Sequence, residues 1–227
     1  MKFIVFGLGN FGLSLAMKLT KLGHEVIGVD RSEDKVDLIK DSITHAVALD
    51  STSVQAVKTL PIADADAVVV AIGEDEGASI MTTALLKQLK AKRIVGRAIS
   101  PLHQTVLESM GVDELMHPEE DSAERLALKL DMKGVVESFA LSDQYSIVEV
   151  RLPERYTGQT IMETNFRSKY NVNILTIIRT EEKINLIGIK RKKQKVLGVL
   201  APDTQLIQGD ILVIFGATQD IQKIMES

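Results

Sequence analysis

The sequence predicts an α/β protein: a Rossmann-like doubly wound parallel sheet followed by a second, smaller α+β domain. Residues 2–30 follow the pattern strand, glycine-rich turn, helix, strand. Short apolar runs then alternate with helical patterns as far as residue 117, which makes six strands and is typical of a doubly wound sheet. Beyond residue 141 the runs alternate apolar and polar residues, as half-buried strands do. We therefore predict a first domain over residues 1–141 and a second over residues 142–227.

The opening stretch contains a phosphate-binding pattern. Lys2–Phe6 is predicted to be a buried strand and Leu13–Leu22 a helix, and between them lies the G-x-G-x-x-G motif Gly7-Leu8-Gly9-Asn10-Phe11-Gly12. The first glycine permits a tight turn, the second lets backbone approach a pyrophosphate, and the third lets the helix pack closely on the strand. The helix N-terminus offers unpaired N–H groups and the positive end of its dipole to phosphates.

An acidic residue follows the second predicted strand, Glu25–Val29. Asp30 stands about 20 residues after the glycine motif, where a carboxylate accepts hydrogen bonds from ribose hydroxyls. Arg31 has two interpretations. It could meet the 2′-phosphate of NADP, but Asp30 would repel that phosphate, so a solvated arginine near the helix that Ser32 caps is favoured.

Later strands supply further candidates, because residues at the carboxyl ends of parallel strands lie on the ligand side of such sheets. The predicted strands are His45–Leu49, Ala67–Ile72, Arg93–Ala98 and Glu114–His117. The candidates at or after the ends of the first three are Asp50, Ser51, Thr52, Ala71, Ile72, Gly73 and Arg97. Asp50–Thr52 could instead cap the next helix, and Arg97 could cap a neighbouring helix rather than reach a phosphate. The acids of residues 74–76 more simply begin the helix Gly77–Leu89 than bind a metal.

The segment after the sixth strand also has two interpretations. In His117-Pro118-Glu119-Glu120-Asp121 the acids could cap a helix or form a carboxylate site for a hard cation. Residues from Ser122 to about Leu141 are predicted to be helical, with an apolar stripe that packs against another subunit.

The second domain is predicted to have a mixed or antiparallel sheet. Its strands are 147–152, 174–178, 184–189 and 211–215, its helices are 162–170 and 220–225, and Gln208-Gly209-Asp210 is a turn. The basic run Lys190–Lys195 is either a solvated hairpin strand or a contact for anionic headgroups or an anionic ligand.

Composition narrows the functional class. The chain has 227 residues, a net charge of −4 and no cysteine, so disulfides, thiolate metal sites and global attraction to nucleic acid are excluded. The sequence has no uncharged run as long as a membrane span and no room for a signal peptide before the first strand, so we expect an intracellular soluble protein. It lacks a Walker-type G-K-[ST] motif and a tyrosine with lysine four positions later, and its four histidines have no evident carboxylate partner. A nucleotide site without catalytic groups predicts a binding protein rather than an enzyme.

Several motifs together resemble the RCK (KTN) domain of Ktr/Trk-type potassium-uptake regulators, in the single-unit form typified by KtrA. They are the glycine motif, Gly23-His-Glu-Val26 with Val29-Asp30, Thr44-His-Ala-Val47, Val70-Ala-Ile-Gly73, His117-Pro-Glu119 and Tyr145-Ser-Ile-Val-Glu149. Asn165-Phe-Arg-Ser-Lys-Tyr170 and Gln208-Gly-Asp210 resemble the C-terminal subdomain (TrkA-C) of the same family. The resemblance covers essentially the whole chain.

The resemblance implies a cytoplasmic homodimer that assembles into an octameric ring beneath a membrane potassium-translocating subunit of the KtrB/TrkH kind. ATP or ADP would occupy the glycine-motif site, and Glu119 would bind a cation (Mg²⁺, Ca²⁺ or Na⁺) under the terminal phosphates at the dimer interface. Cyclic di-AMP could bind the second domain at Ile161, Thr164, Asn165, Arg167 and Pro202.

One position departs from the family pattern. Family members of this type often have arginine where this chain has Asn10, which carries no charge for a γ-phosphate. NAD(H) and AMP therefore stay open as ligands. The alternative functions are an NAD(P)-dependent oxidoreductase and a free-standing cyclic di-AMP receptor.

Overall fold

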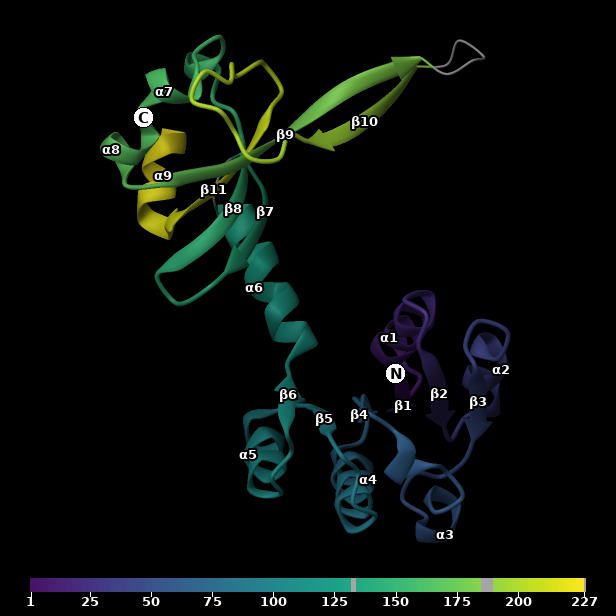
Figure 1. Ribbon diagram of the computed structural model, residues 1–227. Helices are drawn as coiled ribbons and strands as arrows, with labels where there is room; N and C mark the ends of the chain where they lie inside the picture. The colour runs from purple at the N-terminus through teal and green to yellow at the C-terminus, as the bar shows by residue number, and fades with distance from the viewer. Residues whose placement is uncertain (132–133, 185–189, 227) are drawn as a thin grey trace. The chain divides into compact units, whose positions relative to one another are not determined.

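The computed structural model describes residues 1–131, 134–184 and 190–226. The chain divides into two compact units, Met1–Glu119 and Glu120–Ser227 (Figure 1). The domain limits predicted at residues 141 and 142 stay a prediction.

The first unit is built on a six-stranded parallel sheet. Its strands are β1 (Lys2–Phe6), β2 (Glu25–Asp30), β3 (His45–Ala48), β4 (Ala67–Val70), β5 (Ile94–Arg97) and β6 (Glu114–Met116). They lie in the order β3-β2-β1-β4-β5-β6, and every neighbouring pair is parallel. Strand order reverses between β1 and β4, and ligands of such sheets bind in the crevice at that point. The predicted doubly wound sheet is confirmed.

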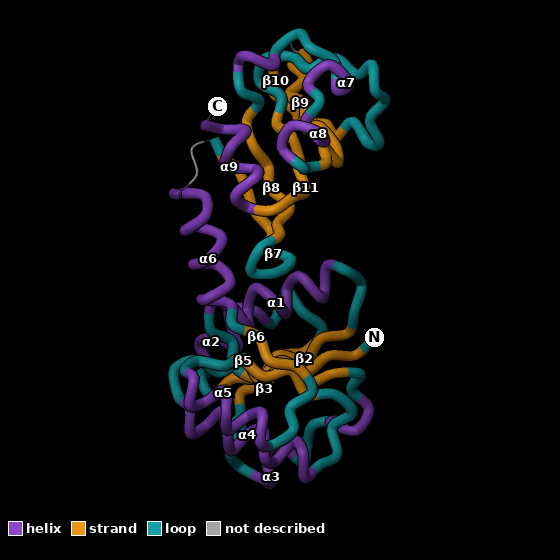
Figure 2. The backbone as a smooth tube through the Cα atoms, turned by 90° about the vertical axis from the view of Figure 1, so that its left-hand side faces the viewer, coloured by secondary structure: helices purple, strands orange, loops and turns teal. Residues whose placement is uncertain are grey.

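Helices cover both faces of this sheet (Figure 2). They are α1 (Asn10–Lys21), α2 (Glu33–Ile39), α3 (Val54–Val57), α4 (Glu76–Gln88) and α5 (Pro101–Ser109), with a 3₁₀ turn over Ile62–Asp64. On one face Val5 and Val26 pack with Ala16 and Val36 of α1 and α2. On the other face, Ile4 and the other strand residues that point to that face pack with α3 and α4. Burial on both faces explains why the strands are continuous apolar runs instead of alternating ones.

The second unit is an antiparallel sheet with short helices. Its strands are β7 (Val135–Ala140), β8 (Tyr145–Arg151), β9 (Asn173–Ile184), β10 (Lys190–Val196) and β11 (Ile211–Ala217), in the order β10-β9-β11-β8-β7. All four pairings are antiparallel. The helices are α7 (Ile161–Thr164), α8 (Phe166–Tyr170) and α9 (Thr218–Glu226), with a 3₁₀ turn over Glu154–Tyr156. Helix α6 (Pro118–Asp131) begins in the first unit, with Pro118 and Glu119, and continues in the second. The smaller α+β unit is confirmed, while the predicted strand 184–189 lies, apart from Ile184, outside the described residues.

Two predicted helices are wrong in extent. The helix expected from residue 122 to 141 is described as far as Asp131, but residues 135–140 form β7, which pairs with β8, and Gly134, with a φ of 84°, leads into that strand. Val135 and Val136 are β-branched and favour that strand. The helix expected over residues 162–170 is split at Asn165, whose φ of 50° is left-handed. The packing of α6 against another subunit stays a prediction, and none of the described α6 side chains is buried within the chain.

Candidate functional site

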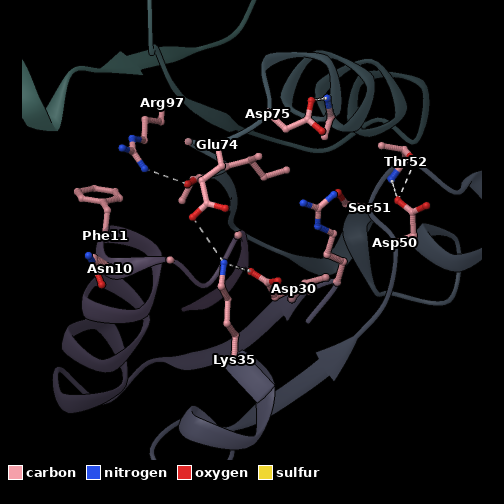
Figure 3. A pocket seen from close by; sticks show the side chains of 18 of the residues that line it. Asn10, Phe11, Asp30, Lys35, Asp50, Ser51, Thr52, Glu74, Asp75 and Arg97 are labelled. Carbon is pink, nitrogen blue, oxygen red and sulfur yellow. Dashed lines mark hydrogen bonds and ion pairs between the residues drawn. The ribbon is translucent and has the colours of Figure 1, made fainter. Parts of the chain in front are cut away.

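A cavity of about 470 Å³ opens at the carboxyl ends of the strands of the first unit, which is the size expected of a small-molecule site. Figure 3 shows the side chains around it. The lining residues are Gly7, Gly9, Asn10, Phe11, Val29, Asp30, Arg31, Lys35, Asp50, Ser51, Thr52, Ala71, Ile72, Gly73, Glu74, Asp75, Ala78, Arg97 and Glu119. The structure therefore brings together every residue predicted from the first unit except Gly12, and whether they bind a ligand stays a prediction.

The glycine motif shapes one wall of the cavity. Gly7 turns the chain with a φ of 91°, and a Cβ there would lie 2.9 Å from the Ile72 nitrogen. Gly9 is the N-cap of α1, no side chain caps this helix end, and a Cβ on Gly9 would meet no protein atom within 4 Å. The first N–H groups of α1 and the bare Gly9 backbone thus form a place where an anion can approach.

Gly12 has a supporting role and does not line the cavity. A Cβ at this position would overlap the carbonyl oxygen of Gly7 and lie 3.2 Å from the Ala71 side chain. The glycine lets α1 start directly against the turn, which is the third function predicted from the motif.

Asp30 is held rigidly at the end of β2. Its Oδ2 accepts a hydrogen bond from the Leu8 nitrogen at 2.7 Å, and its Oδ1 accepts one from the Ser32 nitrogen at 2.9 Å. The residue is 9% exposed. A carboxylate oxygen can accept more than one hydrogen bond, so Asp30 keeps lone pairs for hydroxyl groups of a ligand.

The turn after β3 supplies hydroxyl and carboxylate groups. Asp50 Oδ1 accepts hydrogen bonds from the Thr52 nitrogen at 2.9 Å and the Thr52 hydroxyl at 2.7 Å, and these bonds lower the pKa of the Asp50 carboxyl. The Ser51 hydroxyl is bonded to Thr82 Oγ1 at 2.9 Å. The alternative prediction that residues 50–52 cap the next helix is wrong, because Ser53 is the N-cap of α3.

Arg97 lines the cavity beside the loop after β4. One guanidinium nitrogen donates to the Ala71 carbonyl at 3.4 Å, and another forms an ion pair with Glu119. Any side chain at Gly73 would overlap the guanidinium, so the glycine makes room for the arginine. Arg97 Nε is buried without a partner among the described residues.

Five lining residues were not among the predicted site residues: Val29, Lys35, Glu74, Asp75 and Ala78. Asp75 is the N-cap of α4 and accepts from the Ala78 nitrogen at 2.9 Å, in accord with the predicted helix start, and Glu74 precedes it. Lys35 stands in the first turn of α2, where the helix dipole disfavours a cation. That unfavourable placement is the one signal that could have marked Lys35.

The charge balance of the lining is acidic. The lining contains five acidic residues (Asp30, Asp50, Glu74, Asp75 and Glu119) and three basic ones (Arg31, Lys35 and Arg97). Like charges repel a phosphate ligand unless a cation or a rearrangement offsets them.

The described residues show no preformed metal cluster, and the candidate residues for cyclic di-AMP lie in the second unit. Within residues 1–131, 134–184 and 190–226, no group of three histidines or acids could hold a metal ion. Ile161 and Arg167 lie in α7 and α8, with Asn165 between them, and all three belong to the second unit. The described part of the chain has no helix of the length and apolarity needed to span a membrane.

Comparisons with known proteins agree with this architecture. The TrkA-N domain family matches residues 3–118. Ktr system potassium uptake proteins C and A of Bacillus subtilis are each 36% identical over 222 residues, which cover 98% of this chain and 95% and 94% of those proteins. The solved structure of the GsuK channel bound to NAD has a TM-score of 0.62 at 16% identity; the match covers 99% of this chain and 38% of that one. The chain therefore belongs to the TrkA-N family, among the Ktr-type potassium uptake proteins.

Proposed function

We propose that this chain is the cytosolic regulatory subunit of a potassium-uptake system and that nucleotide bound in the cavity controls potassium flux. The observation that carries the proposal is the cavity itself, where the open N-terminus of α1, the bare Gly9 and the fixed Asp30 carboxylate face one space. Kinship with Ktr potassium uptake proteins along 98% of the chain supports the physiological role.

The proposed ligands contain an adenosine diphosphate group. Asp30 accepts the ribose hydroxyls, Gly9 and the α1 N-terminus bind the phosphates, and Asp50, Ser51 and Thr52 line the adenosine end. ATP and ADP are the first candidates. NAD(H) and AMP are alternatives, since Asn10 supplies no charge and the acidic lining favours a ligand with fewer negative charges.

A cation at Glu119 is proposed together with the triphosphate. One carboxylate does not hold Mg²⁺ alone, but Mg²⁺ in proteins is commonly bound by one or two carboxylates together with substrate phosphates. Glu119 lines the cavity and is 66% exposed at its side chain, so it can supply one such oxygen. A cation there also offsets the repulsion between the acidic lining and the phosphates.

The assembly is proposed from the family as well. We place the chain in a homodimer that forms a ring, with eight subunits, on the cytoplasmic face of the membrane beside a potassium-translocating subunit. Cyclic di-AMP binding at Ile161, Asn165 and Arg167 is a further proposal for the second unit. The rival oxidoreductase function has less support, because the relatives are potassium uptake proteins.

Potassium flux tests this function directly. Vesicles that contain the membrane subunit and this chain are loaded with potassium, and rubidium uptake is measured while ATP is exchanged for ADP. We expect uptake to change with the nucleotide when the wild-type chain is present and to lose that response in the Asp30→Asn variant. Uptake that ignores the nucleotide, or NADH oxidation with a panel of carbonyl compounds, would refute the proposal.

A further inference from the structure

Lys35 reaches into the cavity between two carboxylates. Its Nζ lies 4.0 Å from Asp30 Oδ2 and 3.9 Å from Glu74 Oε1, as the two dashed lines in Figure 3 show. The two acids differ in their surroundings: the Asp30 side chain is 8% exposed and that of Glu74 is 79% exposed. Lys35 thus joins a fixed anion at the end of β2 to a solvated one after β4.

Neither of these contacts is a hydrogen bond. Both separations exceed the 2.7–3.2 Å usual for an N–H···O bond. An ammonium group has three N–H donors, and neither carboxylate takes one of them at hydrogen-bond distance. The pair with Glu74 is also exposed, and exposed ion pairs contribute little stability. A ligand can therefore replace Glu74 at small energetic cost.

The position of Lys35 indicates which ligand group it meets. Asp30 Oδ2, its inner neighbour, is bonded to the nitrogen of Leu8, which lies within the glycine motif. The lysine therefore stands where a nucleotide passes from ribose to phosphate. Arg97, a second basic lining residue, is paired with Glu119, so an incoming phosphate finds neither Lys35 nor Arg97 without an acidic neighbour.

We propose that Lys35 binds a phosphate oxygen of the nucleotide and that this phosphate displaces Glu74 from Lys35. The inference rests on the proposed nucleotide site and adds to it a specific binding residue and a competing carboxylate. A phosphate group has more negative charge and more acceptor oxygens than a carboxylate, so it is the stronger partner for an ammonium group.

Displacement also gives the protein a way to register occupancy. Glu74 directly precedes Asp75, the N-cap of α4. The same loop contacts Arg97: the Ala71 carbonyl accepts a hydrogen bond from the guanidinium, and Gly73 leaves the room that the guanidinium occupies. Release of Glu74 therefore acts on the loop that sets the start of α4.

The test is calorimetric titration of the full chain with ADP and with adenosine, which lacks phosphate. We expect Lys35→Met to weaken ADP binding roughly tenfold, the usual effect of losing a hydrogen bond to a charged group, and to leave adenosine binding unchanged. Glu74→Gln should strengthen ADP binding by about threefold, because the competitor is removed. Lys40→Met, a change at the other end of α2 where the lysine pairs with Asp37, is the matched control and should bind both ligands like the wild type.

The double variant separates competition from a general charge effect. With Lys35 already replaced by methionine, Glu74→Gln should give a smaller gain in ADP affinity than in the wild-type background, because only the general charge repulsion is then relieved. An equal gain in both backgrounds would contradict displacement, and wild-type ADP affinity in Lys35→Met would overturn the role of Lys35 while the nucleotide site stands. Failure of the wild-type chain to bind ADP at all would overturn the nucleotide site and this inference together.

Discussion

Gly9 and Gly12 belong to one motif but differ in what surrounds them. A side chain at Gly9 would enter the cavity and meet no protein atom within 4 Å, and its φ of −69° is allowed for any residue. A side chain at Gly12 would overlap the Gly7 backbone. Stability and ligand binding can therefore be separated by two single substitutions.

We predict that Gly12→Ala destabilises the fold by about 3 kcal/mol, the upper end of the usual cost of overpacking, because backbone must move. Gly9→Ala should leave the free energy of unfolding within about 0.5 kcal/mol of the wild type and weaken nucleotide binding. Urea unfolding of both variants measures the first quantity and calorimetry the second. Equal destabilisation by the two substitutions would show that the turn is not built as described.

At the scale of elements, a loop of the second unit is fixed by one buried acid. Asp210 is 1% exposed and accepts from Arg179 Nε at 2.8 Å, from an Arg179 terminal nitrogen at 2.7 Å and from the Ile207 nitrogen at 2.9 Å. Arg179 also donates to the Gln205 carbonyl at 2.9 Å. The Arg179–Asp210 pair thus joins β9 to the turn before β11. The sequence predicts this turn at Gln208–Asp210.

The costs of removing the two partners of this pair should not be additive. Arg179→Met leaves a buried carboxylate without its cation, and we predict a loss of about 3 kcal/mol in the free energy of unfolding, the lower end for a broken buried pair because Arg179 is 22% exposed. The double variant Arg179→Met with Asp210→Asn should lose less than the sum of the two single variants. Thermal or urea unfolding of the four proteins decides this, and strict additivity would contradict the proposed coupling.

The sequence was informative where local pattern and tertiary packing agree. Apolar strands, the glycine motif and Asp30 were predicted because each has a local signature that the parallel sheet preserves. The helix predicted over residues 135–140 was wrong because an apolar stripe resembles a helix until Gly134 and the pairing of Val135–Ala140 with β8 decide for a strand. Lys35 was missed because its partners, Asp30 and Glu74, are brought together only by the fold.

At the scale of the whole molecule, ligand occupancy has to be converted into a change of shape. A ligand shifts an equilibrium only by its difference in affinity for two states, and reversing a 1:99 ratio takes roughly 10⁴-fold, about 5.5 kcal/mol. In the proposed ring each identical site can contribute a part of that energy. The Lys35–Glu74 exchange and a cation at Glu119 are the two places where such a difference would arise.

The central claim is that an adenine nucleotide binds the opening strand–turn–helix and is not consumed. Calorimetric titration of the full chain with ADP, ATP and NADH, each with and without Mg²⁺, tests it most directly. The account predicts saturable binding of at least one of them with one site per chain, a Mg²⁺ requirement that is greatest for ATP, and recovery of the nucleotide unchanged. No heat of binding from any of the three at millimolar concentration, or their conversion to product, would contradict it.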